Sequence, residues 1–186
     1  MLDQDFLKTL TLLYIEDDET IRDSFFDILD KLFLKIVVVE DGLSGLNAFK
    51  DSLEDENTNF DAIISDINLP KLNGIDLLEE IRHFDENIPF IFTTAQYEPD
   101  CLLKAIKLDV SEYFIKPLDA KEIIMHIQKV CEKRHQESRI IHYQKENKKY
   151  LEVIDQVAIV SRINKNNEYK SVNEFFCEVS GYKEDE

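Results

Sequence analysis

The chain has few of the features that mark secreted, membrane-spanning or metal-finger proteins. Its 186 residues include only three cysteines, scattered and odd in number, so neither a disulfide framework nor a zinc site is expected. No apolar run reaches the roughly 18 residues that a membrane-spanning helix needs. The N-terminus carries acids where a secretory signal would carry basic residues, and we therefore expect a cytoplasmic protein without a membrane partner.

Basic side chains are scarce as well. The chain holds 22 Lys and Arg against 39 Asp and Glu, which gives a formal net charge of −17. Proteins that bind nucleic acid contact its phosphates through clustered Lys and Arg, so we expect no nucleic-acid partner. Most of the acids are expected on a solvated surface, and only acids that converge on one point need a further explanation.

Proline is limited to four copies, all before residue 118. Residues 119–150 contain neither Pro nor Gly and are rich in Lys, Glu and Gln, which predicts one long helix. In one heptad frame Ile127, Val130, Ile141 and Leu151 occupy the a and d positions, but four polar residues occupy them too. Two interpretations remain open: a homodimer joined by a coiled coil of this helix, or a solvated charged helix.

Residues 10–118 alternate short apolar runs with segments of helical period. Five runs are predicted to be strands: residues 10–15, 36–39, 61–65, 90–94 and 112–116. Between them apolar residues recur at helical spacing, as in the stripe of Ile21, Phe25 and Ile28. The middle runs show almost no polar alternation, as expected for strands covered by helices on both faces. The pattern predicts an α/β fold with a doubly wound parallel sheet.

Polar residues follow four of these predicted strands. They are the acids Glu16, Asp17 and Asp18, then Asp66, Thr94 and Lys116. Ligands of open parallel sheets bind at the carboxyl ends of the strands, so these side chains are expected to converge on one edge. Clustered carboxylates suit Mg²⁺, an Asp can act as a nucleophile, and a hydroxyl with an ammonium can bind phosphoryl oxygens. The set predicts phosphoryl-transfer chemistry.

Four stretches, "YIEDDE", "DAIISDINLPKLNGIDLL", "IFTTA" and "EYFIKPL", resemble the receiver domain of two-component response regulators. The resemblance covers residues from about 8 to 130. It implies a flavodoxin-like sheet with strand order 2-1-3-4-5. It also implies phosphorylation by a histidine kinase or a phosphotransfer protein. Phosphorylation would switch the face formed by the fourth helix, fifth strand and fifth helix (the 4-5-5 face) and the C-terminal helix, which would control a downstream output.

The resemblance also assigns roles to single residues. Asp66 matches the phosphoacceptor, and Asp17 and Asp18 match the acidic pair that binds Mg²⁺ with Asp66 and the backbone carbonyl of Asn68. Glu16 is expected to point away from the metal. Further roles follow for phosphoryl sensing (Thr94 and Lys116), for an aromatic switch (Tyr113), for tuning of hydrolysis (Asn68 and Gln96) and for a cis bond before Pro117. Asp109 replaces a common Gly, and Asp tolerates the left-handed conformation better than most residues.

The C-terminal segment carries a second resemblance. "AIVSRI" and "YKSV" are predicted to form a hairpin, followed by Asn173 and a short helix that ends at Gly181. The segment resembles the first third of a PAS sensor domain, and we expect a fragment of a longer protein. The predicted organisation is a receiver domain at residues 1–130, a linker helix at 131–150 and a partial PAS domain at 151–186.

Two other functions compete with the signalling receiver. One is a Mg²⁺-dependent phosphohydrolase with an Asp nucleophile, a class that usually has a second Asp two residues after the first. Asn68 occupies that position, which argues against it. The other is a binding module that has lost phosphorylation, against which the complete set of polar strand-end residues argues.

Overall fold

The computed structural model describes residues 2–54, 59–95, 99–166 and 169–182. The chain forms two compact units, residues 1–135 and residues 136–186. Each unit is described by itself.

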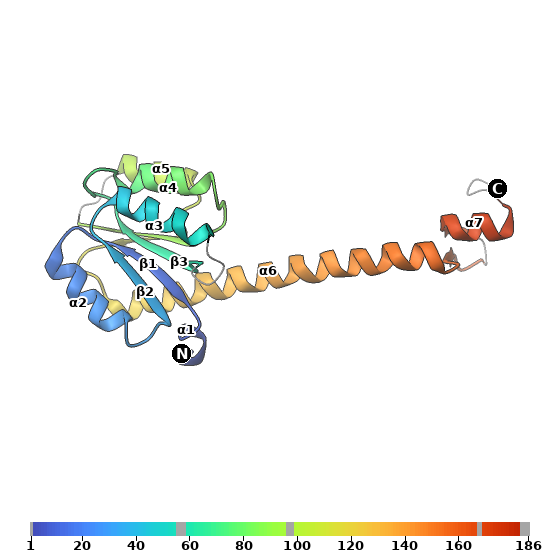
Figure 1. The fold of residues 1–186 in the computed structure, drawn as a ribbon, viewed down its shortest axis with the longest axis horizontal. Helices are drawn as coiled ribbons and strands as arrows, with labels where there is room; N and C mark the ends of the chain where they lie inside the picture. Colours follow the sequence, from blue (N-terminus) through green and yellow to red (C-terminus); the bar gives the residue numbers. More distant parts are fainter. Residues whose placement is uncertain (1, 55–58, 96–98, 167–168, 183–186) are drawn as a thin grey trace. The chain divides into compact units, whose positions relative to one another are not determined.

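The first unit is built on a five-stranded parallel sheet (Figure 1). Its strands are β1 (Thr11–Ile15), β2 (Lys35–Val39), β3 (Ala62–Asp66), β4 (Phe90–Thr94) and β5 (Glu112–Ile115). Their order is β2-β1-β3-β4-β5, and each pairing is parallel. The expected 2-1-3-4-5 order is therefore confirmed. The order reverses between β1 and β3, which is where such sheets place their ligand site.

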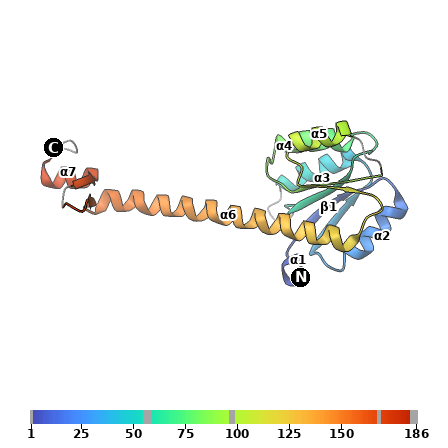
Figure 2. The same ribbon diagram turned by 180° about the vertical axis from the view of Figure 1, so that it is seen from behind.

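Helices cover both faces of this sheet, as Figures 1 and 2 show. One face carries α3 (Gly42–Glu54), α4 (Gly74–Arg82) and α5 (Pro99–Lys107). The other carries α1 (Gln4–Leu7), α2 (Glu19–Leu29) and the first turns of α6 (Ala120–Val157). Two separate cores result: Phe49 and Leu78 pack on one face of the sheet, and Phe25 and Ile127 pack on the other. Strands buried on both sides explain the nearly continuous apolar runs in the sequence.

Two backbone features of the receiver resemblance are present. The Lys116–Pro117 peptide bond is cis, and Asp109 adopts a positive φ of 53°. The guanidinium of Arg82 holds this turn by donating to the carbonyls of Leu108 and Asp109, at 3.0 Å each. Both expectations at these positions are confirmed.

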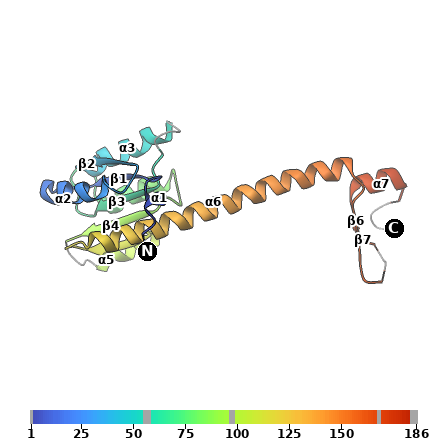
Figure 3. The same ribbon diagram turned by 90° about the horizontal axis from the view of Figure 1, so that it is seen from below.

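Helix α6 is longer than predicted, because it continues beyond Tyr150 to Val157. Its first turns are packed into the first unit, where Ile123, Ile127 and Cys131 are fully buried or nearly so. Polar contacts reinforce this packing. Arg134 pairs with Asp85 at 2.6 Å, and the His135 ring lies 3.0 Å from a carboxylate oxygen of Asp61. Figure 3 shows α1 beside this part of α6, where the Asp3 amide donates to the Gln128 side chain.

The second unit contains the predicted hairpin and short helix. Strands β6 (Ser161–Ile163) and β7 (Tyr169–Val172) pair antiparallel. Helix α7 (Glu174–Ser180) follows, capped by Asn173 at its start and by left-handed Gly181 at its end. Among the described residues, no helix is both long and apolar enough to cross a bilayer.

Candidate functional site

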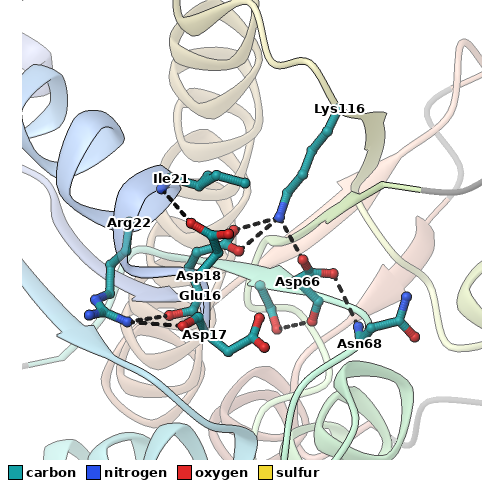
Figure 4. A network of polar contacts seen from close by, with 9 residues as sticks. Glu16, Asp17, Asp18, Ile21, Arg22, Asp66, Asn68 and Lys116 are labelled. Carbon is teal, nitrogen blue, oxygen red and sulfur yellow. Dashed lines mark hydrogen bonds and ion pairs between the residues drawn. The ribbon is translucent and has the colours of Figure 1, made fainter.

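The carboxyl end of β1 carries two carboxylates with different surroundings (Figure 4). Glu16 is fully buried, and its amide continues the sheet by donating to the Val39 carbonyl at 3.1 Å. The next residue, Asp17, is exposed. Ligand oxygens of Glu16, Asp17 and Asp66 all lie within 4.8 Å of one another. The expectation that Glu16 points away is therefore wrong, because its side chain lies within the acidic group.

Asp18 caps a helix in the structure and lies outside the group of three carboxylates. Its carboxylate accepts a hydrogen bond from the Ile21 amide at 2.9 Å and caps the first turn of α2. A carboxylate at this position satisfies an amide that has no partner within the helix and complements the positive end of the helix dipole. The structure thus brings Asp17 into the acidic group together with Glu16, whereas Asp18 caps a helix.

Asp66 ends β3 and is buried, with a relative exposure of 6%. Its Oδ1 accepts a hydrogen bond from the Asn68 amide at 3.1 Å. The start of α4 approaches closely from the other side, since a Cβ on Gly74 would lie 2.4 Å from the Asp66 carbonyl oxygen. Only glycine fits there without moving the backbone, so the sequence "LNG" fixes the loop that follows Asp66.

Lys116 extends across the site from the end of β5. Its ammonium donates to both oxygens of Glu16 at 2.8 Å and to Oδ2 of Asp66 at 2.6 Å. Burial raises the pKa of Glu16, although the hydrogen bond from Lys116 opposes the rise. For Lys116, burial alone would lower the pKa, but hydrogen bonds to Asp66 and Glu16 outweigh it, and the pKa is raised. The ammonium is therefore held charged between two carboxylates.

The remaining predicted residues flank this centre. Thr94 is buried at the end of β4, and its carbonyl accepts from the Lys116 amide at 2.7 Å. Tyr113 lies on β5 and packs against the core that contains Phe92. The centroids of the two rings are 6.5 Å apart in an edge-on arrangement. Gln96 lies outside the described residues. The structure therefore gathers Asp17, Asp66, Asn68, Thr94 and Lys116 at one edge of the sheet.

The acidic group has the chemistry of a magnesium site. It offers hard carboxylate oxygens from Glu16, Asp17 and Asp66 at one point, and Mg²⁺ takes a few such ligands while keeping several waters. One of its carboxylates, on Asp17, is open to solvent, so hydrated metal has access. The residues present fit Mg²⁺.

Arg22 is a positioning residue that the sequence did not reveal. Its Nη1 donates to the carbonyls of Glu16 and Asp17, at 3.1 and 3.4 Å. These bonds fix the backbone from which both acids project (Figure 4). The signal in the sequence was faint: a basic residue one turn into the helix that follows three acids.

A second unpredicted cluster braces the loop that follows Asp66. Asp41 accepts hydrogen bonds from the amide and hydroxyl of Ser44, each at 2.8 Å, and pairs with Lys71 at 2.6 Å. Lys71 has a positive φ of 64°. Its ammonium, with smaller contributions from Ser44, lowers the pKa of Asp41 to about 2. Asp41 and Lys71 lie 30 positions apart, so local sequence patterns could not reveal their contact.

Comparison with known proteins identifies the first unit. A family model described as the response regulator receiver domain matches residues 12–128, which is more than half of the chain. Transcriptional regulatory protein CiaR of Streptococcus pneumoniae is 33% identical over 119 residues, covering 64% of this chain and 50% of that protein. Chemotaxis protein CheY-3 of Vibrio cholerae is 29% identical over 129 residues, covering 68% of this chain and 95% of that protein.

The chain spans about half the length of the transcriptional regulators that it matches, with covered shares of 58%, 54% and 50%. Solved structures agree on the fold. The N-terminal domain of an uncharacterized protein from Wolinella succinogenes matches with a TM-score of 0.61 and 27% identity, over 70% of this chain and 98% of that one. A response regulator receiver domain protein from Clostridium thermocellum matches with a TM-score of 0.60 and 25% identity, over 68% and 98%.

The acidic group of Glu16, Asp17 and Asp66 is consistent with the phosphorylation site of such a receiver, and family membership implies a histidine kinase as partner. With its sheet order, its acidic edge and the match over residues 12–128, the chain belongs to the response regulator receiver domain family, a signalling module of two-component systems.

Proposed function

We propose that Asp66 accepts a phosphoryl group from a histidine kinase or a phosphotransfer protein. The observation that carries this proposal is the surroundings of the Asp66 carboxylate: Lys116 donates to one oxygen at 2.6 Å, and two further acids lie within metal-binding distance. A buried carboxylate held between a cation and a metal-binding pair is suited to attack phosphorus rather than to serve as an ordinary surface acid.

Mg²⁺ is the proposed cofactor. Asp17 and Asp66 would hold it, with the backbone carbonyl of Asn68 as a further ligand and Glu16 as the buried acid beside them. When bound, Mg²⁺ supplies positive charge that offsets the charge of the incoming phosphoryl oxygens. Asp18 is left out of this ligand set because its carboxylate caps α2.

In the proposed transfer, a carboxylate oxygen of Asp66 attacks the phosphorus of a phosphohistidine. The new P–O bond forms as the P–N bond breaks, and the imidazole nitrogen keeps the electron pair. Lys116 then shares its hydrogen bonds with a phosphoryl oxygen, and the Thr94 hydroxyl binds another. Hydrolysis reverses the state when water attacks the same phosphorus and releases inorganic phosphate, with Asn68 and Gln96 as the proposed tuning positions.

The phosphohistidine protein that donates the phosphoryl group would dock beside Lys116. A mostly apolar pocket of about 520 Å³ lies between α2 and the loop after β5. Its wall includes Ile21, Phe25 and Ile28 from α2 as well as Lys116 and Pro117. An apolar surface that ends at Lys116, next to Asp66, suits a helix that presents a phosphohistidine.

The proposed output runs through Thr94 and Tyr113 to α5, β5 and α6. Because the short α1 precedes the sheet, these elements are the fourth helix, fifth strand and fifth helix of the domain core, that is, the 4-5-5 face. Phosphorylation shifts this face between two states. We further propose that α6 joins two copies of the chain and leads from the receiver (residues 1–130) through a linker (131–150) to a partial PAS domain (151–186).

The test is incubation of the chain with Mg²⁺ and acetyl phosphate, followed by intact-mass measurement. We expect one added phosphoryl group, lost when Asp66 is replaced by Asn. A chain that gains no mass, or an Asp66→Asn variant that gains as much, contradicts the proposal. A separate reaction with small phosphate esters and Mg²⁺ tests the competing phosphohydrolase, which requires release of many equivalents of inorganic phosphate per chain.

A further inference from the structure

The second half of α6 carries a row of exposed apolar side chains. Large apolar residues between positions 140 and 157 are 44–69% exposed: Ile140, Ile141, Tyr143, Tyr150, Leu151, Val153, Ile154 and Val157. Apolar side chains in such number on one solvated helix are unusual unless a partner covers them. The first turns of α6 do not share this property, since Ile127 and Cys131 are buried in the receiver core.

Five of these eight residues occupy the a and d positions of a heptad frame that begins at Ile140, whereas Ile141, Leu151 and Val153 fall at b, e and g. Positions a are Ile140, Asn147 and Ile154, and positions d are Tyr143, Tyr150 and Val157. We call these six residues the seam. In the frame that places Ile127 and Val130 on the same line, those two residues pack against the receiver. We therefore define the seam by the frame that begins at Ile140.

The charged residues of this stretch lie off the seam. Lys145, Lys148 and Glu152 occupy b or f positions, and Lys148 and Glu152 form an i,i+4 ion pair at 3.9 Å. Residues 139–157 hold four basic and three acidic side chains. This segment is therefore nearly neutral within a chain of net charge −17, so charge repulsion between two copies of the helix is small here.

We infer that the seam binds the seam of a second copy of this chain as a parallel, in-register, two-stranded coiled coil. The central residue decides the orientation. In a parallel in-register pair each a residue meets its own copy, so Asn147 faces Asn147 and the two amides can donate to and accept from each other. In an antiparallel pair Asn147 would face an apolar or aromatic d residue. β-branched Ile at the other a positions also favours two strands.

The seam is short. It spans residues 140–157, about 27 Å of helix, whereas self-sufficient coiled coils generally sustain at least three or four heptads. The polar layer at Asn147 further weakens it. We therefore expect a reversible dimer with a dissociation constant roughly in the micromolar range. This inference specifies the partner of the helix named in the proposed function, and it stands or falls independently of Asp66 phosphorylation.

Two neighbouring isoleucines provide a matched pair for the test. Ile140 is 55% exposed at an a position, and Ile141 is 52% exposed at a b position. Sedimentation or light scattering of the full chain at concentrations up to about 1 mM is expected to give a dimer. Ile140→Asp is expected to weaken association at least about tenfold, whereas Ile141→Asp retains it. A monomer throughout, a trimer or tetramer, or equal effects of both variants would overturn the inference.

Orientation is tested by cysteine cross-linking. In a chain with Cys101→Ser and Cys177→Ser, and with the buried Cys131 left in place, Ile154→Cys is expected to form an interchain disulfide under a mild oxidant. Gln156→Cys, at a c position, is not. A dimer in which Ile154→Cys does not cross-link contradicts the parallel register.

The two proposals remain separable. Ile140→Asp is expected to gain a phosphoryl group from acetyl phosphate as the unmodified chain does. If no chain is phosphorylated while the seam variants behave as expected, the seam stands and the proposed function fails; if phosphorylation succeeds but every chain is monomeric, the reverse holds.

Discussion

Asp17 and Asp18 are adjacent acids with different contacts. Asp17 belongs to the acidic group, and Asp18 caps α2. Mg²⁺ is expected to stabilise the unmodified chain by about 1–3 kcal/mol at saturating concentration. Asp17→Ala is expected to remove most of this effect. Asp18→Ala should keep the response to Mg²⁺ while lowering stability by about 1 kcal/mol through loss of the cap.

The measurement is urea unfolding of each chain with and without MgCl₂, with NaCl matched for ionic strength as the control. A chain carrying Asp18→Ala that no longer responds to Mg²⁺ would return Asp18 to the ligand set.

Gly74 allows the start of α4 to lie close to Asp66, because glycine has no Cβ. A Cβ there would lie 2.4 Å from the Asp66 carbonyl oxygen and 2.9 Å from the Phe92 ring. Gly74→Ala is therefore expected to cost about 1–3 kcal/mol of stability and to slow phosphoryl gain from acetyl phosphate. Gly45→Ala is the control, because its Cβ would meet mainly the end of the flexible Ile15 side chain at 2.5 Å. Equal losses in both variants would contradict the special role of Gly74.

The sequence predicted most residues of the site but not the division of labour among the three acids. Asp66, Thr94 and Lys116 follow from the ends of buried strands, which apolar runs locate to within a residue or so. Among three consecutive acids, the apolar run before them does not show which side chain points inward. An error of one residue in the predicted end of the strand exchanges the inward and outward side chains. The capping preference of Asp three residues before Ile21 was the available signal for Asp18.

At the scale of elements, the Asp41 cluster joins the start of α3 to the loop after β3. The pKa of Asp41 is about 2 in the folded chain, below its ordinary 3.8. The stabilisation is therefore fully present above about pH 4 and is lost as pH falls through about 2. Asp41→Asn is expected to destabilise the fold at pH 7, and the difference from the unmodified chain should shrink from pH 4 to pH 2.

Urea unfolding at pH 7, 3 and 2 measures this dependence. Asp51→Asn, an exposed carboxylate on the same helix α3, controls for the removal of one negative charge. A difference for Asp41→Asn that stays constant over these pH values would argue against the ion pair with Lys71.

Asn173 links the three elements around the end of α6. Its Nδ2 donates to the carbonyls of Asp155 and Ala158, and its Oδ1 accepts from the amides of Val160 and Phe176. Asn173→Ala is expected to lower hydrogen-exchange protection at both amides by about tenfold or more, as loss of a hydrogen bond worth about 1 kcal/mol or more implies. Asn173→Asp keeps the acceptor, so protection at Phe176 should survive. Unchanged exchange in Asn173→Ala would refute the linkage.

The same residue explains where sequence-based prediction of the elements fell short. The five strands and their order followed from buried apolar runs and the receiver resemblance. The end of α6 did not, because no Gly or Pro marks a stop after Tyr150. Asn173 binds the carbonyl of Asp155 in the last turn of the helix and that of Ala158 just after it. Asn173 lies 18 and 15 positions from these two residues in sequence.

At the scale of the whole molecule, a net charge of −17 opposes the approach of two copies. Salt screens such repulsion over about 8 Å at physiological ionic strength. The dimer proposed above is therefore expected to tighten, by roughly threefold or more, between about 50 and 500 mM NaCl. Sedimentation at both salt concentrations measures the change. A dimer that weakens with salt would indicate that attraction between charges, and not the apolar seam, holds the copies together.

Helix α6 is continuous from Ala120 to Val157, and this continuity sets an angular relation along its length. Cys131 faces the receiver core, and Ile140, the first seam residue, follows nine positions later. Each residue turns an α-helix by about 100°. Deleting one residue between them would thus shift the heptad phase of the helix by that angle, while removing seven would nearly restore the phase. For the proposed seam, the number of residues in this interval would then matter more than their identity, because the number sets the heptad phase.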